Sequence, residues 1–317
     1  MGLRPARLSI LIYHRVPCEP DPLQPELADA RLFARHMRWL GRFFNVLALP
    51  EAAARLRAGT LPPRAVAITF DDGYADNAEV ALPILQELGL PATFFIATGF
   101  LDGGRMWNDT VIETVRRWPG PSLAVPGLDL EPVRVGGLQE RRAALRRLLP
   151  AIKYLEPDRR EAVCTALAES VEAPLPRPMM RSVQVRELAR AGMTIGAHTR
   201  SHPILTRLSA GDARRELEGS RVDLEAITGA RVTSLAYPNG KPGRDYTGEH
   251  VELARQLGFT VAVTTAMGTA GPASDPLQLP RFPPWDRSSP RYLARLFHAR
   301  LFPAEAARAP APLMGGT

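Results

Sequence analysis

Short apolar runs and amphipathic segments alternate along most of the chain. Runs rich in β-branched and aromatic residues and bounded by turn residues predict strands, whereas apolar residues at helical spacing predict helices. Strands are expected at residues 8–13, 45–49, 65–70, 92–98, 193–197, 232–237 and 259–264. Helices are expected at residues 27–40, 51–58, 76–88, 183–191, 212–227 and 249–257. Repeated strand–helix units with short turns predict a parallel sheet with helices outside it.

The number of strand–helix units favours a closed or nearly closed α/β barrel over an open sheet. Residues 103–181 break the rhythm, because they are rich in Arg and Leu, mostly helical in pattern, and interrupted by a Pro- and Gly-containing loop at 119–137. We interpret them as a helical insertion between two barrel strands. Residues 303–317 are rich in Ala, Pro and Gly and are expected to form a disordered tail, which leaves residues 1–302 as a single domain.

The positive charge of the chain gives little information about which molecules it binds. The net charge is +7, and it comes almost entirely from Arg, since Lys occurs only at Lys153 and Lys241. The Arg residues are scattered through helix-like segments, which is typical of a solvated face, and weak attraction to anionic lipid is the alternative. No helix-turn-helix, zinc-finger or aromatic-basic RNA motif occurs in the sequence, so nucleic acid is not expected as a partner.

Neither the cysteines nor the first residues indicate secretion. Cys18 and Cys164 lie far apart and match no C-x-x-C pattern, which argues against a disulfide framework or a cysteine metal site. The apolar run at residues 8–13 is too short for a signal peptide or a membrane span. We therefore expect a cytoplasmic protein, with peripheral association at the inner face of the membrane as an alternative. The sequence does not indicate an oligomeric state.

The strongest local motif is T-F-D-D-G at residues 69–73, directly after a predicted strand. Adjacent carboxylates repel each other unless a cation or a proton is shared between them. Since neighbouring residues of an extended segment point to opposite sides, Asp71 and Asp72 can serve two roles, one facing a metal and one facing a reacting water. The alternative is an ordinary turn, because Asp and Gly are common turn formers.

A second motif, H-T-R-S-H at residues 198–202, follows another predicted strand. Two histidines separated by three residues can bind one cation, and Pro203 favours a loop over a helix here. Asp72, His198 and His202 would supply two imidazoles and one carboxylate and leave one position open, as in catalytic rather than structural sites. Zinc is the natural occupant of such a site, and cobalt, nickel or manganese would suit the same ligands.

Together the two motifs resemble those of the polysaccharide deacetylases of carbohydrate esterase family 4, the NodB-homology fold. The chain looks most similar to the branch that contains exopolysaccharide and poly-N-acetylglucosamine deacetylases, and the likeness extends over about residues 8–297. The resemblance implies a deformed (β/α)7-type barrel. It also implies that Asp71 is the general base and that Asp72, His198 and His202 bind the metal.

The third motif of the family, R-x-P-x-G, corresponds here to A-Y-P-N-G at residues 236–240, so that Ala stands where the family has Arg. In the family that Arg orients the catalytic Asp. We expect Arg281, in L-P-R-F-P-P-W, to take its place at the substrate site, with an ordinary surface Arg as the alternative. Tyr237 and Pro238 are expected to contact the substrate, and the backbone N–H of Tyr237 is our candidate for holding the oxyanion.

Two histidines are candidates for the general acid. The family places an acid His near the C-terminus, which would correspond to His298 in R-L-F-H-A-R. His14, in L-I-Y-H-R-V, resembles instead the N-terminal Y-H motif from which poly-N-acetylglucosamine deacetylases supply the acid. Because His14 follows the first predicted strand, it should lie on the same barrel face as the other motifs, and we favour it. A buried structural histidine is the alternative reading of His14.

Two tryptophans are candidate substrate contacts. Trp107 opens the insertion and Trp285 lies in P-P-W-D. Either ring could stack on a sugar or close a pocket around the acetyl methyl group. The alternative is that they simply cover core, as aromatic residues in loops often do.

The residues as a set predict a metal-dependent N-deacetylase that acts on the acetamide of N-acetylated sugars in a polysaccharide or a lipid-linked glycan and releases acetate. The cation would activate water and polarise the acetyl carbonyl. Asp71 would take the proton from water, and His14 would protonate the departing amine. Two alternatives stay open: a deformylase or other amide hydrolase acting on a small or lipid-linked substrate, and a non-catalytic glycan-binding protein with the same fold.

Overall fold

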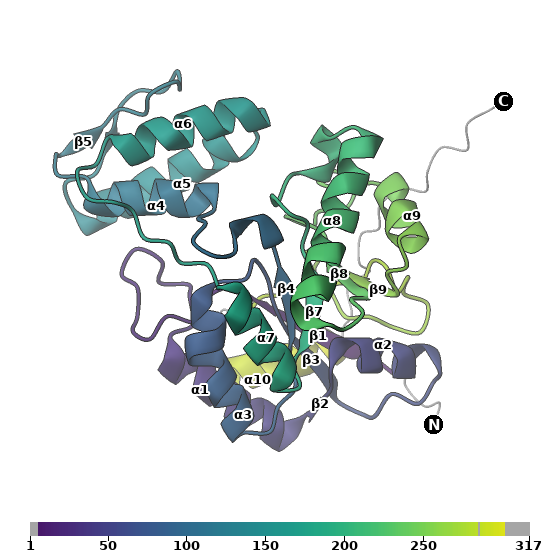
Figure 1. Ribbon diagram of the computed structural model, residues 1–317. Helices are drawn as coiled ribbons and strands as arrows, with labels where there is room; N and C mark the ends of the chain where they lie inside the picture. The colour runs from purple at the N-terminus through teal and green to yellow at the C-terminus, as the bar shows by residue number, and fades with distance from the viewer. Residues whose placement is uncertain (1–5, 285, 302–317) are drawn as a thin grey trace.

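The main sheet is parallel and curls around the centre of the molecule (Figure 1). The computed structural model describes residues 6–284 and 286–301. Hydrogen-bonded neighbours follow the order β1-β3-β4-β7-β8-β9, and β2 pairs with the start of β3. The strands are β1 (Leu8–Tyr13), β2 (Asn45–Val46), β3 (Ala65–Phe70), β4 (Thr93–Ile96), β7 (Thr194–Ala197), β8 (Ser234–Ala236) and β9 (Val261–Val263). Each lies within a strand predicted from the sequence.

An irregular segment, residues 276–282, connects the two ends of this strand order. It is hydrogen bonded to β9, where the N–H of Ala262 donates to the Pro276 carbonyl at 2.8 Å. It is also hydrogen bonded to β1, where the N–H of Phe282 donates to the Ile10 carbonyl at 3.1 Å. The sheet is therefore a deformed α/β barrel in which an irregular segment takes the place of the last strand, and this confirms the predicted fold class.

The helices that cover the barrel carry the apolar stripes expected from the sequence. They are α1 (Ala30–Phe43), α2 (Leu49–Arg57), α3 (Leu82–Glu87), α7 (Ser182–Arg190), α8 (Ala210–Thr228), α9 (Gly248–Gln256) and α10 (Ser289–Leu301), with a π-helical turn at Asn77–Ala81 and 3-10 turns at Thr98–Phe100 and Leu205–Arg207. In α1 the Asp29 side chain caps the helix by accepting from the N–H of Leu32. The buried side of α1 comprises Leu32, Phe33, His36, Met37 and Leu40. Burying each of the aliphatic and aromatic side chains contributes about 1.5–3 kcal/mol.

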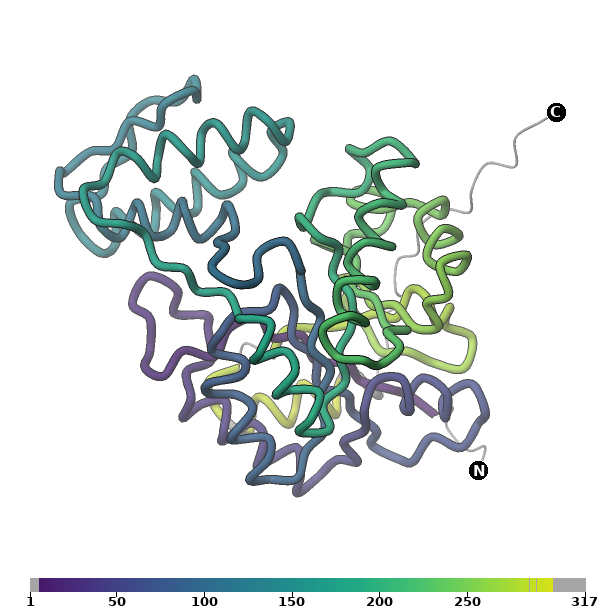
Figure 2. The backbone as a smooth tube through the Cα atoms, viewed as in Figure 1, coloured from purple at the N-terminus to yellow at the C-terminus, as the bar shows by residue number. Residues whose placement is uncertain are grey.

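The insertion between β4 and β7 forms a layer of its own beyond the carboxyl ends of the strands (Figures 1 and 2). It contains α4 (Trp107–Arg117), α5 (Leu138–Lys153) and α6 (Pro157–Glu169), and the two-stranded antiparallel hairpin β5 (Ser122–Leu123) and β6 (Val133–Arg134). The sequence analysis treated the hairpin region as a loop and missed these short strands. Apolar side chains from all three helices bury one another in a separate hydrophobic cluster, which includes Val111, Leu148 and Leu167.

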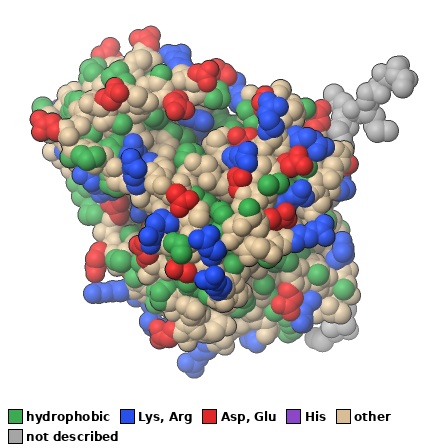
Figure 3. Space-filling model, viewed as in Figure 1, with side chains coloured by type: hydrophobic (Ala, Val, Ile, Leu, Met, Phe, Trp, Pro, Cys, Tyr) green, Lys and Arg blue, Asp and Glu red, His purple; other side chains and the backbone are tan. Residues whose placement is uncertain are grey.

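The visible surface carries interspersed positive and negative side chains (Figure 3). This pattern agrees with a solvated charged face rather than a single basic patch on that side. Within the described part of the chain, no helix combines the length and the apolar character that crossing a bilayer requires. The predicted tail, residues 303–317, lies outside the described residues.

Candidate functional site

The T-F-D-D-G motif forms the turn that leaves the carboxyl end of β3. The Gly73 N–H donates to the Asp71 carbonyl at 3.0 Å, and Asp72 adopts a left-handed backbone with φ of 77°. Such a conformation costs a non-glycine residue roughly 1 kcal/mol or more, although Asp tolerates it better than most. Gly73 has φ of 92°, and an added Cβ would lie 3.1 Å from the Ile96 side chain. The turn therefore directs the two carboxylates to different partners, as the motif predicted.

Asp71 is held by a buried, bidentate ion pair with Arg281. Two guanidinium nitrogens donate to the two carboxylate oxygens at 2.7 Å each, and Arg281 is 0% exposed. Two further donors of the guanidinium bind the Thr264 carbonyl at 3.0 Å and Thr69 Oγ1 at 3.1 Å. Arg281 comes from the closing segment 276–282, so the barrel closure itself places this side chain beside β3. Arg281 thus orients Asp71, as expected of a residue that takes the place of the family Arg, and the alternative of a surface Arg is wrong. Because it is buried and does not line the cavity, the expectation that it also contacts the substrate is corrected.

The charge environment keeps Asp71 ionised. Burial by itself raises the pKa of the Asp71 carboxyl, but the charge and hydrogen bonds of Arg281, together with the charges of His198 and His14, outweigh this effect, and the pKa lies below its usual value. A carboxylate whose orientation is fixed on both oxygens is available as a proton acceptor over a wide pH range.

Asp72, His198 and His202 converge at the same edge of the barrel, and their ligand atoms all lie within 4.8 Å of one another. Asp72 Oδ1 lies 3.4 Å from His198 Nε2 and 3.5 Å from His202 Nε2. Two ligands on adjacent corners of a tetrahedral zinc site are roughly 3.3–3.6 Å apart, given bond lengths of about 2.0–2.2 Å. The Nδ1 of His198 lies 2.7 Å from the Ala236 carbonyl, to which it donates, so its Nε2 is the ring nitrogen that faces Asp72 and that would bind a cation once it is deprotonated. The residues therefore fit a divalent cation.

The protonation states of Asp72 and His202 suit a cation, whereas the two neighbouring carboxylates raise the pKa of His198 against the effect of its burial, so that a cation would displace a proton there. Burial raises the pKa of Asp72, yet the hydrogen bond with His198 and the nearby histidine charges bring it well below its usual value. Burial lowers the pKa of His202 to about 3. An ionised carboxylate and a neutral imidazole are the forms that bind metals.

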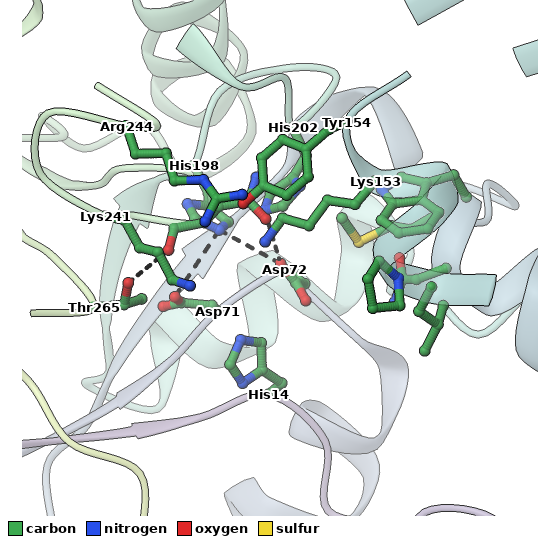
Figure 4. A pocket seen from close by; sticks show the side chains of 16 residues that line it. His14, Asp71, Asp72, Lys153, Tyr154, His198, His202, Lys241, Arg244 and Thr265 are labelled. Atoms are coloured by element: carbon green, nitrogen blue, oxygen red, sulfur yellow. Dashed lines mark hydrogen bonds and ion pairs between the residues drawn. The ribbon is translucent and has the colours of Figure 1, made fainter. Parts of the chain in front are cut away.

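Of the two candidate acids, only His14 lies at the cavity. It follows β1 directly, is exposed, and lines the same cavity as Asp71 and Asp72 (Figure 4). The alternative of a buried structural histidine is wrong for His14, since its ring is accessible. His298 is exposed on α10 and is not among the residues that line this cavity.

The expectations for Tyr237 and Pro238 are wrong. Both residues are buried, and the ring of Tyr237 stacks on Tyr246 with centroids 4.1 Å apart. The backbone N–H of Tyr237 donates to the Val263 carbonyl, because the chain is still hydrogen bonded to β9 at this point, so that N–H is not available to an oxyanion. Asn239, two residues later, lines the cavity instead.

The cavity has a volume of about 580 Å³, and the insertion forms one of its walls. Trp107 lines it, as predicted, whereas Trp285 lies outside the described residues. The sequence analysis missed seven cavity residues with polar side chains: Asn108, Lys153 and Tyr154 from the insertion, Asn239, Lys241 and Arg244 from the loop after β8, and Thr265 after β9. One signal was present in the sequence, because Lys153 and Lys241 are the only lysines of the chain, and both line this cavity.

The chain matches a known protein family and a relative in Bacillus subtilis. A family model described as polysaccharide deacetylase matches residues 58–118 and 150–262. YxkH of Bacillus subtilis (strain 168), whose name places it among the polysaccharide deacetylases, is 23% identical over 269 residues, which cover 84% of this chain and 67% of YxkH.

Two solved structures share the fold. One is the Streptococcus pyogenes deacetylase PplD in complex with acetate, with a TM-score of 0.62 and 21% identity, covering 92% of this chain and 98% of PplD. The other is IcaB from Ammonifex degensii, with a TM-score of 0.60 and 19% identity, covering 93% of this chain and 97% of IcaB.

Proposed function

Because this chain belongs to the polysaccharide deacetylase family, whose members hydrolyse carbon–nitrogen bonds other than peptide bonds, we propose that it is a metal-dependent N-deacetylase of glycans. The observation that carries the proposal is the juxtaposition of two separately held carboxylates. Asp71 is fixed by Arg281, and Asp72 lies 3.4 and 3.5 Å from the two histidines of a cation site. One carboxylate is thus free to accept a proton while the other is committed to the cation.

The donor set suits zinc or a similar divalent ion, which when bound polarises the acetyl carbonyl and activates water. Asp71 then accepts a proton from the attacking water, because its carboxylate is ionised and faces the cavity. His14, which follows the neighbouring strand β1 at the same edge of the barrel, donates a proton to the departing nitrogen. Each of these proton transfers contributes about 10²- to 10⁴-fold in rate. The products are acetate and an amino sugar.

The substrate we propose is an N-acetylated sugar within a glycan. A wide, open-sided cavity that includes the Trp107 ring suits a sugar, since aromatic side chains offer an apolar face together with a polar rim. PplD, a deacetylase of the same fold that was solved in complex with acetate, is consistent with the proposed release of acetate.

The proposal is tested by incubating the full chain with an N-acetylglucosamine tetramer and measuring acetate and formate separately. Metal content is measured by elemental analysis before and after chelation. We expect acetate release that is lost on chelation and restored by zinc. Bound metal without any acetate or formate would favour a non-catalytic glycan-binding protein, and formate from a formylated sugar without acetate would favour a deformylase.

A further inference from the structure

The only two lysines of the chain, together with Arg244, gather on one side of the cavity. Lys153 ends α5 in the insertion, while Lys241 and Arg244 belong to one turn in the loop after β8, where the Arg244 N–H donates to the Lys241 carbonyl at 3.2 Å. In Figure 4 the three side chains extend into the cavity above Asp71 and Asp72. Two segments that are distant in sequence therefore bring three positive charges to one site.

Tyr154 fixes two of these cations near each other. The guanidinium carbon of Arg244 lies 4.2 Å from the centroid of the Tyr154 ring, and the Lys153 amino group lies 5.5 Å from the same centroid. Arg244 also forms a side-chain hydrogen bond with Tyr154, and the guanidinium has five N–H donors, so further donors remain for another partner.

The three cations are not neutralised within the described part of the chain. No acidic side chain there forms an ion pair with any of them. Asp245 is the acidic group whose charge reaches Lys153, but it is buried and accepts a hydrogen bond from the backbone N–H of Lys241 at 3.0 Å. Burial lowers the pKa of Lys153, and the charges of Lys241 and Arg244 lower it further, although Asp245 opposes them. The carboxylate of Asp71, in turn, is already paired with Arg281.

We propose that Lys153, Lys241 and Arg244 form an anion subsite, so that the substrate is an N-acetylated sugar carrying a phosphoryl or carboxylate group next to the acetamide. This inference rests on the proposed function for the identity of the reacting group, and it adds the charge of the substrate. Lys and Arg are the side chains that bind such anions, Lys as a point charge and Arg through a planar fork. A surplus of cations beside a concave site also attracts anionic ligands at long range.

The test measures binding with sugars that lack an acetamide and cannot be deacetylated. The zinc-loaded full chain is titrated by calorimetry with glucose 1-phosphate, glucuronate and glucose, which carry a phosphoryl group, a carboxylate and no charge. The test variant combines Lys153→Gln, Lys241→Gln and Arg244→Gln. The control variant combines Arg38→Gln, Arg57→Gln and Arg190→Gln, which are exposed, lie away from the cavity and remove the same charge.

We expect at least one charged sugar to bind about tenfold or more tightly than glucose to the wild type and to the control variant, since one added hydrogen bond between charged groups is enough for a gain of that size. The preference should fall to about twofold or less in the test variant, and the charged sugar with the larger loss identifies the group. If the test variant does not fold, Lys241→Gln and Arg244→Gln are measured singly, because both side chains are exposed.

Equal binding of the three sugars by the wild type would overturn the subsite, as would equal losses in the test and control variants. Acetate release from the N-acetylglucosamine tetramer is measured in parallel on the same proteins. Failure of that reaction counts against the deacetylase alone, whereas the binding result decides the anion subsite by itself.

Discussion

The Asp71–Arg281 pair makes the sharpest prediction, because Arg281 is fully buried and makes four hydrogen bonds. Replacing it with Met keeps much of the side-chain volume but leaves Asp71 as a buried charge without a partner. Breaking a buried pair in this way costs about 3–5 kcal/mol of unfolding free energy. Arg281→Lys keeps the charge but cannot supply the same fork of donors, so we expect an intermediate loss.

The same substitution should change the pH profile of the reaction. In the wild type Arg281 holds the pKa of Asp71 below its usual value against the effect of burial. Without Arg281, burial raises that pKa, so the acidic limb of kcat/KM moves to higher pH, and each unit of movement corresponds to about 1.4 kcal/mol. Arg281→Lys should restore part of the original limb, as expected of a positioning residue that acts through Asp71.

The assay combines urea unfolding with acetate release between acidic and neutral pH. Arg116→Met is the matched control, since Arg116 forms a similar bidentate pair with Asp21 at 3.0 and 2.6 Å but is partly exposed and remote from the cavity. We expect that control to lose about 1 kcal/mol and to keep the wild-type pH profile. A double variant of Arg281→Met and Asp71→Asn should be more stable than Arg281→Met alone. An unchanged acidic limb in Arg281→Met, together with near wild-type stability, would refute the reasoning.

Three further predictions concern histidines and the base. Asp71→Asn should lower acetate release by about 10²- to 10⁴-fold while zinc remains bound, whereas His198→Ala should lose both zinc and activity, as measured by elemental analysis beside the assay. His14→Ala should reduce turnover strongly, and His298→Ala, which changes a histidine outside the cavity, should not; the opposite result would transfer the role of acid to His298. Burial lowers the pKa of His36 to about 4, compared with 6.5 for a free histidine, so the unfolded state takes up a proton first as the pH falls. The contribution of His36 to the free energy of unfolding should therefore be complete above pH 6.5 and fall by about 3 kcal/mol towards pH 4. His36→Phe keeps the stacking on Tyr292 and should show a smaller decline in urea unfolding. An equal decline in the variant and the wild type would exclude His36 as the cause.

Local sequence patterns were sufficient for the strands and for the two main motifs. A short continuous apolar run such as residues 65–70 suits a strand that is buried on both faces, and its alternation with helical segments favours a parallel sheet. Motifs directly after such strands must then lie at the carboxyl edge of the barrel, because parallel strands end on the same side. Asp71, Asp72, His198, His202 and His14 could all be assigned to one face on this basis.

Other parts of the site depended on where distant segments pack. Arg281 could only be suggested from the sequence, since its contact with Asp71 requires residues 276–282 to lie between β9 and β1. Lys153 and Tyr154 reach the cavity only because the C-terminal end of α5 lies above it. The periodicity of a helix predicts that the helix forms, but not where its end lies relative to the barrel.

Tyr237 shows why proximity in sequence to a motif was a poor guide. Its place in the A-Y-P-N-G motif suggested that its backbone N–H could hold the oxyanion, but the hydrogen bonding between β8 and β9 continues by one residue and occupies that donor. Strand identity follows from the hydrophobicity of a few adjacent residues, which is a local property. Which polar groups remain free at the strand ends depends on the partners that the rest of the chain provides, and only the tertiary structure decides that.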